Sequence, residues 1–173
     1  ISAAASVALL VSILLITRNT PQAVADHPLI QPGQEKATLV LDNGKSYKLK
    51  SKQEILLSDN QRIEIKDSRV DYSLNTRQNG KVRYNTIIVD RGETFNLVLS
   101  DGTRVYLNSE TELRFPVQFT GDTRSVELTG EAYFEVTKNK QLPFRVHSNN
   151  HEIEVLGTSF NISAYDDEEV ITT

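Results

Sequence analysis

The sequence of 173 residues contains no cysteine, no methionine and no tryptophan, and only 7% of its residues are aromatic. The lack of cysteine excludes disulfide bonds, a thiol nucleophile and a thiolate metal site. It also gives no indication of the redox compartment. The lack of tryptophan argues against a module that binds sugars on exposed aromatic side chains. The charge and the amino terminus are more informative.

A concentrated positive charge is also missing. The chain has 19 Lys and Arg against 23 Asp and Glu, a formal net charge of −4, and the two signs are interleaved. Binding to a phosphate backbone requires a basic surface, so we expect no nucleic-acid partner. With 38% hydrophobic residues, the chain is long enough for one domain with a real core and an appendage.

The amino-terminal run ISAAASVALLVSILLI, residues 1–16, contains no charged residue and is typical of a membrane segment. At a rise of about 1.5 Å per residue, about 20 residues are needed to cross a hydrocarbon core of about 30 Å. The run is shorter than that, and the chain opens on isoleucine rather than methionine. We therefore expect residues 1–17 to be a partial transmembrane segment whose beginning lies outside this chain.

A cleaved secretory signal is the alternative interpretation of this end. The small residues Ala23 to Ala25, followed by Asp26, are similar to a processing site. Such sites normally follow the apolar run closely, whereas here Thr17 to Gln22 intervene and include Arg18 and Pro21. The spacing favours the membrane anchor, and both interpretations predict that the remainder is exported.

Residues 18–36 are polar and contain three prolines and a glycine, which predicts a juxtamembrane linker. Beyond them, short β-rich runs alternate with turn signals and no helical period is evident. This predicts an all-β domain at 37–173, with a hairpin region at 37–90 and a core motif region at 91–173. Its short antiparallel strands fit a sandwich or jelly-roll-like arrangement, with a β-solenoid as the alternative. The clearest predicted strands are Thr38–Leu41, Tyr47–Leu49, Ile63–Ile65, Phe95–Leu99, Val105–Leu107, Ser125–Leu128, Ala132–Val136 and Phe144–Val146.

Two stretches of the sequence repeat one another. TLVLDNGKSYKL, residues 38–49, aligns with NLVLSDGTRVYL, residues 96–107. Each contains a strand, an Asn-Gly or Asp-Gly pair and a returning strand. These dipeptides predict tight hairpin turns in which both central residues have positive φ. We expect two similar hairpins in one sheet system.

The stretch EVLGTSFNISAY, residues 154–165, has the composition of a strand, but its apolar residues change faces. Those up to Val155 share one parity, and those from Phe160 to Ala164 share the other. Because side chains alternate between the faces of a strand, a regular strand cannot bury both sets. We therefore expect the chain to bulge or bend near Leu156–Thr158.

Other polar residues have simpler explanations than catalysis or metal binding. His147 and His151 flank a predicted hairpin tip, but a third metal ligand is not apparent. The acidic run 166–169 lacks the spacing of a calcium loop and fits a solvated turn. Glu131 and Glu135 alternate with apolar residues and fit the exposed face of a strand better than a glycosidase pair. We expect no metal and no cofactor.

Four motifs follow one another in the second half of the chain. They are LVLSDGTRVYLNSETELRFP (97–116), RSVELTGEAYFEV (124–136), PFRV (143–146) and VLGTSFNISAYDD (155–167). In this order and spacing they resemble the exported domain of FecR-type anti-sigma factors, over residues 84–173. YNTIIVDRGE (84–93) and the first hairpin are similar to longer versions found with polysaccharide-uptake systems.

The resemblance implies a single-pass inner-membrane protein with this domain in the periplasm. In the family, a cytoplasmic domain ahead of the span binds an extracytoplasmic-function sigma factor. The periplasmic part contacts the signalling domain of a TonB-dependent outer-membrane transporter. We expect the sigma-binding domain and a small α/β receptor-docking domain to lie outside this chain, which then supplies the β-rich middle of the relay.

Some family members cut themselves between the glycine and threonine of this motif, which here would be the bond Gly157–Thr158. Thr158 Oγ1 would attack the Gly157 carbonyl and form an ester that water hydrolyses. A proton acceptor and donors to the oxyanion are also required, and the sequence does not identify them. A bulge that fits Leu156 and Phe160 into one core is the structural alternative.

We thus expect a sensor module in transmembrane control of transcription, without turnover activity apart from this single self-cleavage. One alternative is an exported glycan-binding β-sandwich. Another is a self-processing structural module that takes no part in signalling.

Overall fold

The computed structural model describes residues 34–50, 53–56, 62–66, 69–72, 82–149, 151–165 and 170–173. These residues form strands and loops, and none of them belongs to a helix that could cross a membrane. The predicted transmembrane segment and most of the predicted linker lie outside the described residues. The strands are β1 (Gln34–Val40), β2 (Ser46–Lys50), β3 (Gln53–Leu56), β4 (Arg62–Lys66), β5 (Arg69–Asp71), β6 (Tyr84–Val89), β7 (Glu93–Val98), β8 (Arg104–Leu107), β9 (Thr111–Pro116), β10 (Arg124–Glu135), β11 (Phe144–Ser148), β12 (His151–Val155), β13 (Ser159–Ala164) and β14 (Ile171–Thr172).

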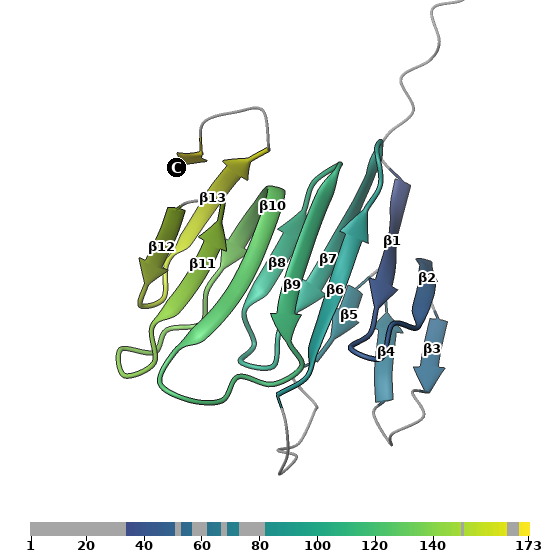
Figure 1. The fold of residues 1–173 in the computed structure, drawn as a ribbon, viewed down its shortest axis with the longest axis horizontal. Coiled ribbons are helices and arrows are strands. Elements are labelled where there is room, and N and C mark those ends of the chain that lie inside the picture. The colour runs from purple at the N-terminus through teal and green to yellow at the C-terminus, as the bar shows by residue number, and fades with distance from the viewer. Residues whose placement is uncertain are drawn as a thin grey trace, which may run out of the picture. The chain divides into compact units, whose positions relative to one another are not determined.

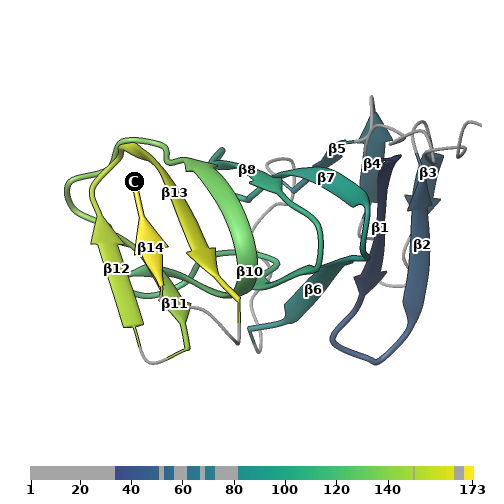
Figure 2. The same cartoon turned by 90° about the horizontal axis from the view of Figure 1, so that it is seen from above.

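A ring of six strands forms a barrel-like closure (Figure 1). Antiparallel ladders join β1 to β6, β6 to β9, β9 to β10, β10 to β8 and β8 to β7. A short parallel contact between Gln34 of β1 and Glu93 of β7 closes the ring. Figure 2 shows β7 and β8 on one side of this ring and β6 on the other. The predicted all-β class of short antiparallel strands is confirmed, with a closure that neither the sandwich nor the solenoid interpretation specified.

The other strands extend this ring at its margins. β2 pairs with β1, and β5, β4 and β3 continue outward from β7. On the opposite side, β11 and β12 continue outward from the first half of β10. β13 and β14 continue outward from its second half. β10 therefore belongs to two sheets.

Side chains of alternating residues fill the interior, because successive residues of a strand point to opposite faces. In β10, Val126, Leu128, Ala132 and Phe134 are buried, whereas the residues between them, apart from Gly130, are half-buried or exposed. Burying one such large apolar side chain contributes about 1.5–3 kcal/mol. The ring of Phe134 stacks on that of Phe160 in β13, with centroids 5.3 Å apart. The core thus extends from the ring to the strands beside it.

The predicted strands at 125–128 and 132–136 are joined in a single bent strand, β10, which ends at Glu135. The bend lies at Gly130, whose φ is +96° and which packs closely against Glu110 and Thr111. Before Gly130 the strand pairs with β9 and β11, and from Gly130 onward it pairs with β8 and β13. The glycine therefore produces a bend between two sheets and not a turn.

The two predicted hairpins are present, but the prediction of their turn type is wrong. Gly44 N donates to Leu41 O in the β1–β2 hairpin, and Gly102 N donates to Leu99 O in the β7–β8 hairpin, each at 2.9 Å. Only the glycine of each loop has positive φ, +80° and +83°. The reason is that Leu41 pairs across the loop with Lys45, so the loop has three residues and not two. Such loops combine a type I turn with a left-handed glycine.

Tyr72 follows β5 and is completely buried, with its phenol oxygen 2.9 Å from Asn85 Nδ2, the donor. Burial raises the pKa of the Tyr72 phenol, and the hydrogen bond from Asn85 opposes this only in part. Tyr72→Phe would leave the buried Asn85 amide without this partner. We expect the free energy of unfolding in urea to fall by about 1–3 kcal/mol.

Tyr106→Phe is the control for this prediction, because Tyr106 is only partly buried and keeps its ring contact with Tyr133 when its hydroxyl is removed. We expect this control to change stability by no more than about 0.5 kcal/mol. An equal loss in the two variants would contradict a special role for the Tyr72–Asn85 hydrogen bond.

Candidate functional site

The chain crosses from one sheet to the other at Leu156–Thr158. β12 ends at Val155 and pairs with β11, whereas β13 begins at Ser159 and pairs with the second half of β10. The predicted bend is therefore present. The apolar residues change faces here because the strand changes sheet, and not because a residue is inserted into one ladder.

The crossover is held by residues 136–143, the loop between β10 and β11. Asn139 N donates to Leu156 O at 2.9 Å, and Val136 N donates to Thr158 O at 3.2 Å. The carbonyl groups on both sides of Gly157 are thus fixed by backbone donors. The 136–143 loop determines the path of the chain at this point.

Gly157 lies directly against this loop. Its φ is +133°, a backbone conformation that residues with a side chain rarely adopt. A methyl group added to Gly157 would lie 2.4 Å from Lys138 Cα and 2.9 Å from Lys138 N. Glycine is required here both by its backbone angle and by the close approach of another backbone.

The Gly157–Thr158 peptide is accessible from solvent. Thr158 is exposed, Gly157 is half-buried, and the Leu156 side chain is 47% exposed. A glycine carbonyl and a hydroxyl-bearing residue thus follow one another at a bend whose residues solvent reaches. These are the groups that an acyl shift from nitrogen to oxygen requires.

The structure does not bring His147 or His151 to this peptide. Ser148 pairs with His151 at the tip of the β11–β12 hairpin, as the sequence predicts. His151 and Val155 are four residue steps apart along an extended strand, a length of about 13 Å. His147 Nδ1 lies 3.2 Å from Glu152 Oε2 on the same hairpin. Neither histidine is placed to act as the proton acceptor.

The described residues contain no group of three or more His, Asp or Glu side chains that could hold a metal ion. The acidic run 166–169 lies outside them.

Glu131, with Tyr133 on the outer face of β10, accepts hydrogen bonds from Asn108 Nδ2 at 2.8 Å and Asn161 Nδ2 at 2.9 Å. Glu135 lies 3.5 Å from an Arg104 nitrogen. The two carboxylates thus interact with their strand neighbours, as the outer face of a sheet predicts.

A buried arginine holds the 136–143 loop, and the sequence interpretation missed it. Arg124 is 1% exposed; its Nε donates to Leu142 O at 2.8 Å and its Nη1 to Thr137 O at 2.9 Å. Nη1 also donates to Asp101 Oδ2 at 2.6 Å. One signal was present in the sequence: Arg124 shares its parity with Val126, so it occupies an inward position of the strand.

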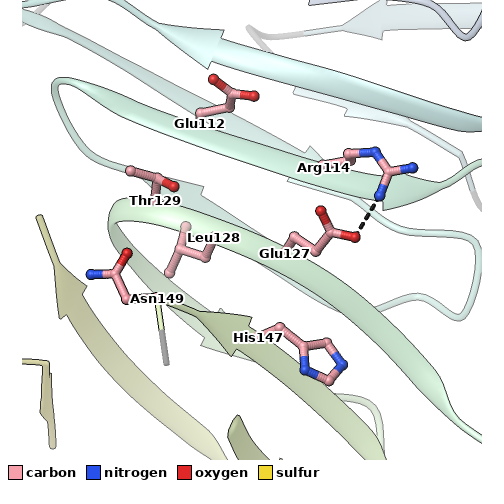
Figure 3. Close-up of a pocket in the computed structure, with 7 residues that line it drawn as sticks. All are labelled: Glu112, Arg114, Glu127, Leu128, Thr129, His147 and Asn149. Carbon is pink, nitrogen blue, oxygen red and sulfur yellow. Dashed lines mark hydrogen bonds and ion pairs between the residues drawn. The ribbon is translucent and has the colours of Figure 1, made fainter. Parts of the chain in front are cut away.

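A hollow of about 350 Å³ lies on the outer face of β9, β10 and β11 (Figure 3). Arg114 and Glu127 form an ion pair within it, and the Arg114 guanidinium lies 4.1 Å from the centre of the Tyr84 ring. Ligand sites are lined mainly by apolar and aromatic side chains. This lining is mostly polar and contains no phenylalanine, tyrosine or tryptophan, so it gives no support to glycan binding. The lining residues are Glu112, Arg114, Glu127, Leu128, Thr129, His147 and Asn149.

Comparison with known proteins identifies the second half of the chain. The family described as FecR protein matches residues 85–173, just over half of the chain. A crystal structure of a "putative anti-sigma factor" from Parabacteroides distasonis ATCC 8503 shares 34% identity over 52% of this chain and 51% of its own, with a TM-score of 0.49. A second structure with the same description shares 35% identity over 51% and 50%, with a TM-score of 0.48.

This chain thus spans about half the length of the two solved structures that it matches. None of the curated proteins matches it. The FecR match covers β7 to β14, nearly all of β6, and the crossover with its supporting loop. By this match, the protein belongs to the FecR family.

Proposed function

We propose that this domain is the periplasmic relay of a membrane-anchored anti-sigma regulator. The observation that supports this most directly is the FecR match over residues 85–173. The four motifs that carry the resemblance fold into one connected unit: the β7–β8 hairpin with β9, then β10, then β11, then the crossover with β13. These elements are joined through β10, which pairs with β8, β9, β11 and β13.

In this proposal, the whole protein is a single-pass inner-membrane protein. Its cytoplasmic part binds an extracytoplasmic-function sigma factor, and its complete periplasmic region contacts the signalling domain of a TonB-dependent transporter. The described domain lies between these two contacts and transmits the signal. It needs no cofactor for this, and it performs no repeated turnover.

Copurification tests the relay. The complete periplasmic region should retain the signalling domain of the transporter encoded beside it, and the full-length protein should retain the sigma factor. Retention of the sigma factor without any retention of the signalling domain would contradict the relay while leaving the anti-sigma role. The signalling domain of an unrelated transporter is the control.

The domain also cuts itself once, between Gly157 and Thr158. Thr158 Oγ1 attacks the Gly157 carbonyl carbon, the C–N bond breaks as the C–O bond forms, and the hydroxyl proton passes to the leaving Thr158 nitrogen. Water then hydrolyses the ester, giving a Gly157 carboxylate and restoring the Thr158 hydroxyl. The exposed Thr158 and the fixed carbonyls on both sides of Gly157 support this assignment.

Substitution of Thr158 tests the self-cleavage. Intact-mass analysis of the full-length protein under denaturing conditions should show two fragments for the wild type and one uncut chain for Thr158→Ala. Thr158→Ser is the matched control and should still be cut, because it keeps the hydroxyl. Since Thr158 is exposed, we expect either change to alter stability by about 0.5 kcal/mol or less. A single uncut wild-type mass would exclude the reaction.

A further inference from the structure

The 136–143 loop has two sets of contacts, one on each side. Towards the crossover, it donates from Val136 N and Asn139 N and lies against Gly157 through Lys138. Towards the interior, it accepts hydrogen bonds from Arg124. The loop therefore connects a buried guanidinium to the peptide bond that the proposed reaction breaks.

The Arg124 guanidinium holds the loop at two points, on either side of Lys138 and Asn139. Nη1 donates to Thr137 O at 2.9 Å and Nε to Leu142 O at 2.8 Å. Between these two carbonyls lie Lys138 and Asn139, the residues in contact with Gly157 and Leu156. Because one planar guanidinium makes both bonds, it fixes the distance between the two ends of the loop.

Asp101 and Thr103, in the turn between β7 and β8, fix the position of the guanidinium. Asp101 Oδ2 lies 2.6 Å from Arg124 Nη1 and accepts from Thr103 Oγ1 at 2.7 Å. Thr103 Oγ1 in turn accepts from Thr137 N at 3.2 Å. The Arg124 side chain is 1% exposed and that of Asp101 14%. The pair is thus a rigid anchor away from solvent.

Stability alone does not explain an arginine at this position. Its Nη2 is buried and has no hydrogen-bond partner among the described residues. Burying a charged pair costs desolvation energy, and apolar side chains of similar volume are often as stabilising or more so. An apolar side chain could not make the hydrogen bonds that Arg124 donates to Thr137 O and Leu142 O.

We infer that Arg124 is a positioning residue for the Gly157–Thr158 peptide, acting through the 136–143 loop. This inference rests on the proposed self-cleavage. A displacement of about 1 Å at reacting groups can slow a reaction by roughly 100-fold. The Arg124 backbone N also donates to Pro143 O, but this bond does not depend on the side chain. Without the two guanidinium bonds, the loop no longer fixes Leu156 O and Thr158 O, and the attack geometry at Gly157 is lost.

The test compares Arg124→Lys with Leu113→Ala in the full-length protein. Lysine keeps a positive charge opposite Asp101 but offers one nitrogen in place of the guanidinium fork. Leu113 is completely buried in β9 and has no part in the loop, so it controls for lost stability. Cleavage is followed over time by intact mass, at a temperature at which both variants are folded. Hydrogen exchange of peptides covering 136–142 is measured in parallel, on chains carrying Thr158→Ala so that they stay intact.

We expect Arg124→Lys to slow cleavage by about 10- to 100-fold and to raise exchange in this loop by roughly tenfold, whereas Leu113→Ala changes neither to that extent. Cleavage of Arg124→Lys at the wild-type rate would overturn the inference. If Arg124→Lys does not fold, Asn139→Ala replaces it. Asn139 is exposed, and its Oδ1 accepts from Gln141 N and Leu142 N, so this variant loosens the loop without disturbing the core.

The two proposals can fail separately. If the wild type is not cut at all, the self-cleavage fails, and hydrogen exchange alone decides the role of Arg124. Loss of protection at 136–142 in Arg124→Lys but not in Leu113→Ala then supports positioning of the loop. Unchanged protection in both variants overturns it.

Discussion

Gly157→Ala is expected to lower the free energy of unfolding by about 4 kcal/mol, a mutational effect at the upper end of the usual range. Two costs add. Alanine at φ +133° is in a region that is essentially restricted to glycine, and its methyl group would lie 2.4 Å from Lys138 Cα. Lys138 Cα is backbone, so it cannot move aside by a change of rotamer. In a domain of this size, the loss corresponds to a fall in Tm of roughly 10 °C.

Urea denaturation followed by circular dichroism measures this loss, with Thr158→Ala as the neighbouring control. If Gly157→Ala unfolds at the same urea concentration as the wild type, the 136–143 loop is free to move away and does not fix the crossover. The expected loss also affects the choice of variants. An uncut Gly157→Ala protein would not distinguish lost chemistry from lost structure, whereas exposed Thr158 allows that distinction.

The bend at the crossover could be predicted because it follows from a local rule. Side chains alternate along a strand, so the change of parity between Val155 and Phe160 requires an interruption. The same rule identified the inward positions of β10, and the Asn-Gly and Asp-Gly pairs identified both hairpins. Each of these predictions depends on residues that are close together in the sequence.

The contacts that were missed depend on residues that are far apart in the sequence. Gly157 approaches Lys138, and Arg124 pairs with Asp101 across 23 positions. The residues next to a glycine in the sequence do not show which distant backbone segment it will contact. The closure between Gln34 and Glu93 likewise depends on where β1 lies after the hairpin has formed. For the same reason, the bend at Gly130 was not predicted, since it depends on the separate partners of each half of β10.

The ring includes a strand that lies outside the region matched to the family. The match begins at residue 85, whereas β1 covers Gln34–Val40 and pairs with both β6 and β7. Without β1, β6 would have an unpaired edge and β7 would lose the pairing of Glu93 and Thr94, and unpaired edges promote association between chains. The first hairpin is therefore part of the same folded unit as the family region.

Gly130→Ala is expected to lower the free energy of unfolding by about 3–5 kcal/mol. A methyl group there would lie 2.7 Å from Glu110 O and 2.8 Å from Thr111 Cα, both of them backbone atoms. Thr111 cannot easily withdraw, because it is buried and its Oγ1 both accepts from Glu131 N at 3.0 Å and donates to Glu131 O at 3.1 Å. The substitution therefore acts on the point at which β10 passes between the two sheets.

Gly121→Ala separates the two causes of this loss. Gly121 has the same φ as Gly130, +96°, but nothing lies within 4 Å of a methyl group added there. We expect it to cost only the backbone term, about 1–2 kcal/mol. Urea denaturation gives the free energy of unfolding of each variant. The difference between the two losses then measures the cost of the steric clash with Glu110 and Thr111. Equal losses would mean that β10 can shift at its bend, and the two sheets would then be less firmly connected than the close packing at Gly130 implies.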